Sequence, residues 1–178
     1  MLLAVNMIGC KSKKDIAKAT NSSEMELPFS GKNYKTDESN FRSVASGTST
    51  DLNTAKEIAM MNARSEISYS IKTVTKNVAD IYINERNGEH GEKLDRISRQ
   101  VSKAVITNII VADHKVFQNS KEGTYTYWVV VEVSKDAVIN NVNNLAAAEK
   151  IDFDKYQYEK VLNEEMKQID KQNELPER

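Results

Sequence analysis

The sequence predicts an α+β fold, in which a small antiparallel three-stranded sheet carries a long helix on one face and a helical extension follows at the C-terminus. Three observations lead to this prediction. Apolar residues recur at helical spacing from Ala55 onward, and two β-rich runs flank a turn that ends at Gly123. The segment 136–173 contains neither glycine nor proline. At 178 residues the chain has room for one domain with appendages.

Composition limits the functional classes. Hydrophobic residues make up 39% of the chain and charged residues 29%, so a core can form beneath a heavily solvated surface. The 25 basic and 26 acidic side chains leave a formal charge of -1, which gives no overall attraction to nucleic acid or anionic lipid. Because Cys10 is the one cysteine, the chain cannot form an internal disulfide.

The first strand and the long helix are predicted in succession. Residues 41–50 are short and rich enough in β-branched side chains for an edge strand, and Gly47 marks a bend or bulge. Asp51, Asn53 and Thr54 are candidates for the N-cap of the helix. The small side chains in its first half allow the helix to lie close to a sheet. The helical stripe consists of Ala55, Ile58, Ala59, Ala63, Ile67, Ile71, Val74, Val78 and Ile81.

A loop, a shorter helix and a hairpin follow. The loop is residues 84–93, and apolar spacing from Leu94 to Val105 predicts the second helix. Residues 106–117 and 124–133 are predicted as strands that pair across the turn between them. Since the second of these strands carries large apolar groups on both faces, it is expected in the centre of the sheet, between the first strand and its hairpin partner. The order is therefore strand, helix, helix, strand, strand.

Residues 136–173 are predicted to be helical, with Asp136 as N-cap and a restart near Asp152 or Asp154. A continuous helix of about 37 residues would span about 55 Å, longer than a small domain. The extension must therefore wrap around the domain, project from it, or pair with a second copy to form a homo-oligomer.

No catalytic constellation emerges, so we expect a protein that is not an enzyme and uses no metal or cofactor. His90 and His114 lack a second histidine at helical spacing, and His90 is expected in a solvated loop. Tyr125, Tyr127 and Trp128 could form a ligand-stacking platform, but core packing is the favoured interpretation. Nucleic acid is not an expected ligand, because single-strand binders combine such aromatics with a basic groove.

The N-terminus resembles a bacterial lipoprotein signal. The apolar run MLLAVNMIG occupies residues 1–9, directly before Cys10, and KSKKD follows. This resemblance to a lipobox implies cleavage before Cys10 and a diacylglyceryl group on its sulfur. The run is short and lacks a basic start, so either the true start lies upstream of Met1 or the resemblance is accidental. Residues 10–40 are predicted to be a flexible tether, with Leu27, Phe29 and Tyr34 able to dock on the domain.

A family resemblance rests on three segments. They are NFRSVASGTS at 40–49, the Ala55, Ala59, Ala63-Arg64 series, and GTYTYWV at 123–129. Together they resemble the Lpp-twenty type of bacterial lipoprotein and, more distantly, the N-terminal domain of a flagellar H-ring protein. The resemblance implies a cell-envelope location, a helix on a small antiparallel sheet and no enzymatic activity. In such a fold Arg64 would pair with Glu57 or Glu66.

These arguments predict four regions and one leading function. The regions are a signal peptide at 1–9, a lipid-anchored tether at 10–40, an α+β domain at 41–135 and a helical extension at 136–178. We expect a non-catalytic lipoprotein, held in the outer membrane through Cys10, that acts by contacting other envelope proteins. The alternative is an envelope binding module for a small molecule or glycan that uses the sheet face around Trp128.

Overall fold

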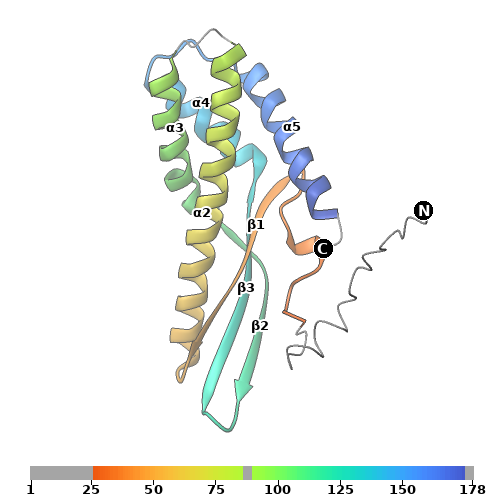
Figure 1. The fold of residues 1–178 in the computed structure, drawn as a ribbon. Helices are drawn as coiled ribbons and strands as arrows, with labels where there is room; N and C mark the ends of the chain where they lie inside the picture. The colour runs from red at the N-terminus through yellow and green to blue at the C-terminus, as the bar shows by residue number, and fades with distance from the viewer. Residues whose placement is uncertain (1–25, 86–89, 175–178) are drawn as a thin grey trace, which may run out of the picture.

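The computed structural model describes residues 26–85 and 90–174, and it confirms the predicted α+β class. A three-stranded sheet forms one end of an elongated molecule and a group of helices forms the other, with one long helix running through both (Figure 1). The elements are η1 (Lys32–Tyr34), β1 (Asn40–Ser49), α2 (Leu52–Glu85), α3 (Gly91–Ala104), η2 (Val105–Asn108), β2 (Ile110–Asn119), β3 (Thr124–Ser134), α4 (Lys135–Ala148) and α5 (Lys155–Glu174).

The strand order β1-β3-β2 confirms the predicted topology, with both pairings antiparallel and β3 in the centre. Val129, Val131 and Val133 point from β3 toward α2 and are buried, and Val130 is buried on the opposite face. A register shift between Val111 and Asp113 interrupts the β2–β3 ladder. β2 begins later than the sequence predicted, because residues 105–108 form the short helix η2.

The start of α2 lies against β1. The Asp51 carboxylate accepts the Thr54 N–H at 2.8 Å, so Asp51 is the N-cap among the predicted candidates. Gly47 faces the helix so closely that a Cβ there would lie 2.4 Å from the Ala55 carbonyl oxygen and 2.5 Å from the Ala59 nitrogen. Alanines on the helix and a glycine on the strand therefore bring the two backbones together.

The second half of α2 packs in a helical group with α3, α4 and α5 (Figure 1). Tyr82 of α2 and Tyr158 of α5 meet with their ring centroids 5.8 Å apart. One continuous hydrophobic cluster joins the sheet to all of these helices. Residues 135–174 therefore contribute to the same core as the sheet and α2.

The C-terminal region wraps around the domain in two helices. The buried stripe of α5 consists of Tyr158, Val161, Leu162 and Met166. Because of this stripe, the sequence left open that the extension pairs with a second copy. In the structure these side chains pack into the core of their own chain. Asp154 caps α5, as its carboxylate accepts the Gln157 N–H at 3.0 Å. Ser134 caps α4 in place of the predicted Asp136, which lies in the first turn of the helix.

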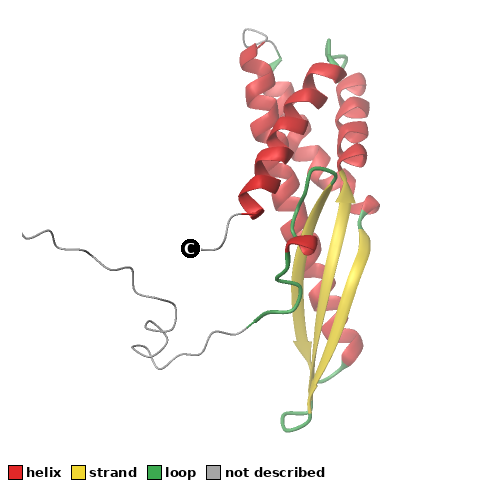
Figure 2. Cartoon of the chain, turned by 90° about the vertical axis from the view of Figure 1, so that its right-hand side faces the viewer, coloured by secondary structure: helices red, strands yellow, loops and turns green. Residues whose placement is uncertain are grey.

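Residues 26–39, which we call the strap, lie against the sheet on the face opposite α2 (Figure 2). Phe29 is buried, its ring contacts Tyr34 edge-on, and the Lys115 ammonium lies 4.8 Å from the Phe29 centroid. Leu27 is exposed. Phe29 and Tyr34 thus dock on the domain, as the sequence allowed, whereas Leu27 does not. Cys10, with the predicted signal peptide and the rest of the tether, lies outside the described residues.

Candidate functional site

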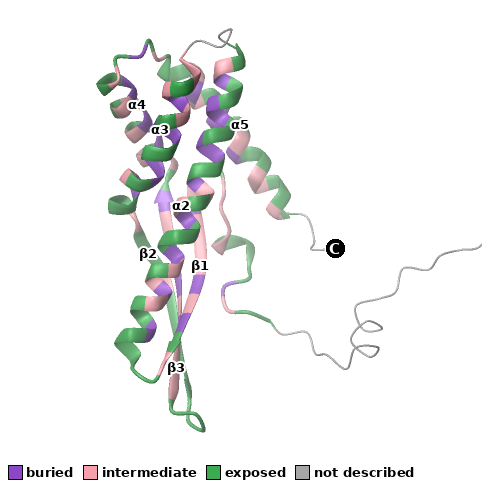
Figure 3. Ribbon diagram, turned by 60° about the vertical axis from the view of Figure 1, so that its left-hand side comes forward, coloured by how far each residue is buried: buried purple, intermediate pink, exposed green. Residues whose placement is uncertain are grey.

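The most exposed apolar surface of the sheet is the edge strand β2. Nine of its ten residues are exposed and the tenth, Asp113, is half-buried. The cause is the position of α2, which packs on β1 and β3 and leaves β2 beyond its reach (Figure 3). The four large apolar side chains of β2 are Ile110, Val111, Val116 and Phe117, at 57%, 48%, 44% and 49% exposure.

The opposite edge of the sheet is closed by side chains. On β1, the Arg42 N–H is donated to the Thr36 hydroxyl at 3.0 Å, and that hydroxyl lies 3.3 Å from the Arg42 carbonyl oxygen. The Ser46 carbonyl oxygen accepts the side-chain amide of Asn62 at 3.0 Å. The strap and α2 therefore occupy outward backbone groups of Asn40, Arg42 and Ser46, and so obstruct pairing of another strand along β1.

These bonds also fix which backbone groups of β2 face outward. Since Arg42 and Ser46 turn their backbone away from β3, their partners Glu132 and Trp128 turn theirs toward β2. Lys115 lies opposite Trp128, so its backbone groups bond to β3. The backbone groups of the residues on either side of Lys115 therefore point away from β3. In the regular part of β2 that follows the register shift between Val111 and Asp113, the residues with outward backbone groups are His114, Val116 and Gln118. Among the described residues, no side chain from another element is hydrogen-bonded to their backbone groups.

The three aromatic candidates on β3 do not form one platform. Tyr127 is buried on the α2 side of the sheet and stacks on His114, with centroids 5.5 Å apart and planes 5° from parallel. Tyr125 points to the same side, where its hydroxyl accepts the Gln118 amide at 3.4 Å. Trp128 is half-buried on the other face, the face that the strap crosses. Strand alternation thus separates Trp128 from both tyrosines.

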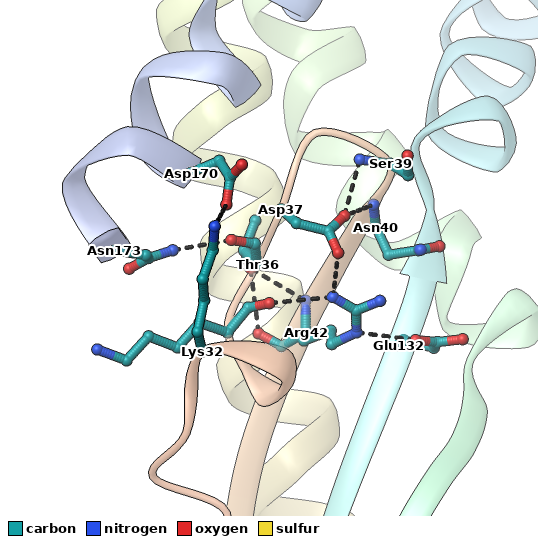
Figure 4. Close-up of polar contacts among 10 residues, drawn as sticks. Lys32, Thr36, Asp37, Ser39, Asn40, Arg42, Glu132, Asp170 and Asn173 are labelled. Carbon is teal, nitrogen blue, oxygen red and sulfur yellow. Dashed lines mark hydrogen bonds and ion pairs between the residues drawn. The ribbon is translucent and has the colours of Figure 1, made fainter. Parts of the chain in front are cut away.

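A polar network holds the strap to the sheet (Figure 4). The Arg42 guanidinium donates to Glu132 Oε2 at 2.9 Å, to the Lys35 carbonyl at 3.1 Å and, through a short bond, to the Asp37 carboxylate. Burial alone would raise the pKa of Asp37, but the bonds from Arg42 and two backbone N–H groups outweigh it and lower that pKa. Arg42 thus joins three segments of chain at one point.

The strap is also tied to the end of α5. The Lys32 ammonium forms an ion pair with Glu174. Figure 4 shows its second ion pair, with Asp170, and the Asn173 amide that donates to the Thr36 carbonyl at 2.8 Å. The hydrogen bond from Lys32 lowers the pKa of the Glu174 carboxyl. Both partners are exposed, so this ion pair adds little stability.

The hollows on the surface do not resemble a ligand site. One of about 550 Å³ lies between α5, the strap and the start of α4, and another of about 340 Å³ lies between the strap and Lys115. The first mixes lysines with glutamates, and Trp128 lines neither. No structural observation therefore favours a binding module at Trp128. The first hollow is lined by Glu38, Lys135, Tyr156, Glu159, Lys160, Asn163, Glu164 and Lys167.

Other residues singled out in the sequence have structural positions. His90 precedes α3 in the left-handed conformation, with a φ of 63°. Arg64 is exposed on α2 and, within the described part of the chain, forms an ion pair with neither Glu57 nor Glu66; the Ser43 hydroxyl donates to Glu66 instead. In residues 26–85 and 90–174, no three His, Cys, Asp or Glu side chains converge as metal ligands. No helix in these ranges is long and apolar enough to cross a bilayer.

Sequence reasoning missed the two most informative features. The contrast between a closed β1 edge and an open β2 edge depends on how the side chains of Thr36 and Asn62 turn back onto the backbone of β1, which no residue pattern marks. The Arg42–Glu132 pair joins residues 90 positions apart. A partial signal was present in β2, where apolar residues at 110, 111, 116 and 117 fall on both faces of a predicted strand.

Comparison with known proteins adds no identification, since no family model, curated protein or solved structure matches this chain. The fold and the surface together define a small α+β protein with one open sheet edge.

Proposed function

We propose that this chain is a non-catalytic lipoprotein of the bacterial cell envelope, anchored in the outer membrane through Cys10, that acts by contacting other proteins. The lipobox-like run ending at Gly9-Cys10 supports the anchor. The sequence resemblance to the Lpp-twenty type supports the location. The helix on a small antiparallel sheet agrees with that resemblance, although a fold alone does not select a function.

The open edge of β2 carries the proposed contact function. A long edge strand with apolar side chains is a template for pairing with another chain, and proteins usually block such edges. Here the β1 edge is blocked and the β2 edge, ten residues long, is left unpaired by the described chain. Strand addition would bond the backbone of a partner and bury the four apolar side chains.

The anchor can be tested by mass spectrometry of the N-terminal peptide from membranes. We expect Cys10 to be the first residue of the mature chain and to carry a lipid, and signal-peptidase inhibition to retain the leader. Cys10→Ser should release the protein from the membrane fraction. A mature chain with an unmodified Cys10 would refute the anchor.

The contact surface can be tested in intact cells with a photo-crosslinking residue at position 117. We expect Phe117 replacement to yield a discrete crosslinked protein, and the same replacement of Tyr156, an exposed residue on α5, to yield none. Equal crosslinking from both positions, or none from position 117, would refute a docking role for β2.

A further inference from the structure

We propose that β2 pairs with β2 of a second copy, in antiparallel orientation about a twofold axis, to form a closed dimer with a continuous six-stranded sheet. This inference rests on the proposed contact function and names the partner. It follows from three features of the sheet: which edge is open, which backbone groups face outward, and how charge is placed on the strand.

One open edge per chain determines the kind of assembly. If both edges were open, β1 of one copy could pair with β2 of the next and chains would add without limit. Thr36 and Asn62 bond the outward backbone of Arg42 and Ser46 on β1, so that route is obstructed. β2 is then the sheet edge left to meet β2 of another copy, and a self-complementary contact of this kind stops at two copies.

The backbone of β2 is suitably arranged for this pairing. His114, Val116 and Gln118 turn their backbone groups away from β3, as the bonding pattern of β1 requires. The His114 N–H is donated to the carboxylate of its own neighbour, Asp113, at 2.7 Å. In a single chain this local bond gives the His114 N–H an acceptor. When two strands pair, the same N–H donates to a backbone carbonyl of the partner instead.

Charge on β2 is complementary to itself. Asp113 and Lys115 project from the same face, one on each side of His114. An antiparallel pair centred on His114 places Asp113 of each copy opposite Lys115 of the other, which gives two cross-strand ion pairs. Opposite charges at facing positions stabilise paired strands, and like charges destabilise them. The existing contacts of these side chains, Asp113 with Tyr34 and Lys115 with Phe29, lie on the strap side of the sheet.

The exposed apolar side chains of β2 also favour this strand as the dimer interface. β2 contributes no residue to the hydrophobic core, although Ile110, Val111, Val116 and Phe117 are apolar. Pairing with a second β2 removes part of this apolar area from water in both chains at once. The core-facing residues of β1 and β3 are already covered by α2 and do not need the second copy.

The test measures the mass of the full chain carrying Cys10→Ser, by light scattering and by sedimentation over a wide range of concentration. We expect a monomer–dimer equilibrium. Val116→Pro removes an outward N–H without touching the β2–β3 ladder, and edge strands tolerate proline at such positions. It should abolish the dimer while leaving the circular dichroism spectrum unchanged. A wild-type chain that stays monomeric, or assembles beyond two copies, would overturn the proposal.

A charge exchange tests the register and does not depend on the proline variant. Asp113→Lys alone and Lys115→Asp alone place like charges opposite each other, and each should raise the dimer dissociation constant by about tenfold. Mixing the two variants should restore dimers that contain one copy of each, as should combining both changes in one chain. If the mixture stays monomeric while wild type dimerises, the register centred on His114 is wrong.

The experiments distinguish a failure of the proposed dimer from a failure of the wider contact function. A monomeric purified protein that still crosslinks through position 117 to a different envelope protein would overturn the dimer and leave the proposed contact function standing. If the native protein taken from membranes carries no lipid on Cys10, while the Cys10→Ser chain still dimerises through β2, the anchor alone is overturned.

Discussion

The Arg42 side chain on β1 donates to the Glu132 carboxylate on β3 at 2.9 Å, and the same guanidinium holds Asp37 of the strap. Arg42 and Glu132 are directly opposite in the ladder, 90 residues apart in sequence. The side chain of Arg42 is only 14% exposed, so its partners would be left partly desolvated without it.

Replacement of Arg42 by alanine should therefore destabilise the fold. We expect a loss of about 2 kcal/mol in the free energy of unfolding, measured in urea, because two carboxylates lose charge-assisted hydrogen bonds. Arg64→Ala, the same change at an exposed position, should stay within about 0.5 kcal/mol of wild type. Equal effects of the two substitutions would show that the network contributes nothing.

Acid should release the strap. The pKa of Asp37 is lower in the folded chain than in the unfolded one, so its contribution is complete above about pH 4 and is lost as the pH falls through the folded value. Trp128, the single tryptophan, lies on the face that the strap crosses, and its fluorescence should change in this range. Asp37→Asn should reduce the acid-dependent change, whereas Asp80→Asn, at an exposed position on α2, should retain it in full.

Gly47 should not tolerate a side chain. Because a Cβ there meets the α2 backbone at 2.4 Å and 2.5 Å, Gly47→Ala must push the helix away from the sheet, at a cost of about 3 kcal/mol or more. Gly31→Ala is a suitable control, since its Cβ would lie 3.9 Å from Tyr34 in ordinary contact. Thermal unfolding compares the two. A wild-type melting temperature for Gly47→Ala would contradict the close approach of helix and strand.

Residues 135–174 should be required for folding. A chain ending at Ser134 would expose the helical side of the core, and we expect it to lose cooperative unfolding. Leu162→Ala in the full chain should cost about 3 kcal/mol, as for other buried leucines. Tyr156→Ala on the same helix, at 79% exposure, should have almost no effect. If the shorter chain unfolds cooperatively, residues 135–174 are not part of the core.

The sequence was sufficient for the elements whose evidence is local. The stripe from Ala55 predicted α2, and apolar groups on both faces of residues 124–133 placed β3 in the centre. The sequence was insufficient where the choice between two structures depends on residues far apart in the chain. The apolar stripe of α5 is compatible with wrapping or with pairing between copies, and only the position of α2 decides between them. Whether Phe29 docks on the domain is likewise undecided by the sequence, because its contact residue Lys115 is distant along the chain.

The caps show the same distinction at a smaller scale. Ser134 and Asp136 both suit the start of a helix by residue type, but the last paired residue of β3 determines where α4 begins. Ser134 is that residue, and its hydroxyl accepts the Ala137 N–H at 3.2 Å. The candidate docking edge was beyond sequence analysis for a related reason, because an edge is open only if no other segment returns to cover it.

The continuity of α2 has a consequence for how the molecule unfolds. At about 1.5 Å per residue, its 34 residues form a rod of about 51 Å that belongs to the sheet at one end and to the helical group at the other. Neither end has a complete core without it, so neither can open alone without exposing part of the same helix. The two ends should exchange their slowest amide protons through a single cooperative event, despite the distance between them.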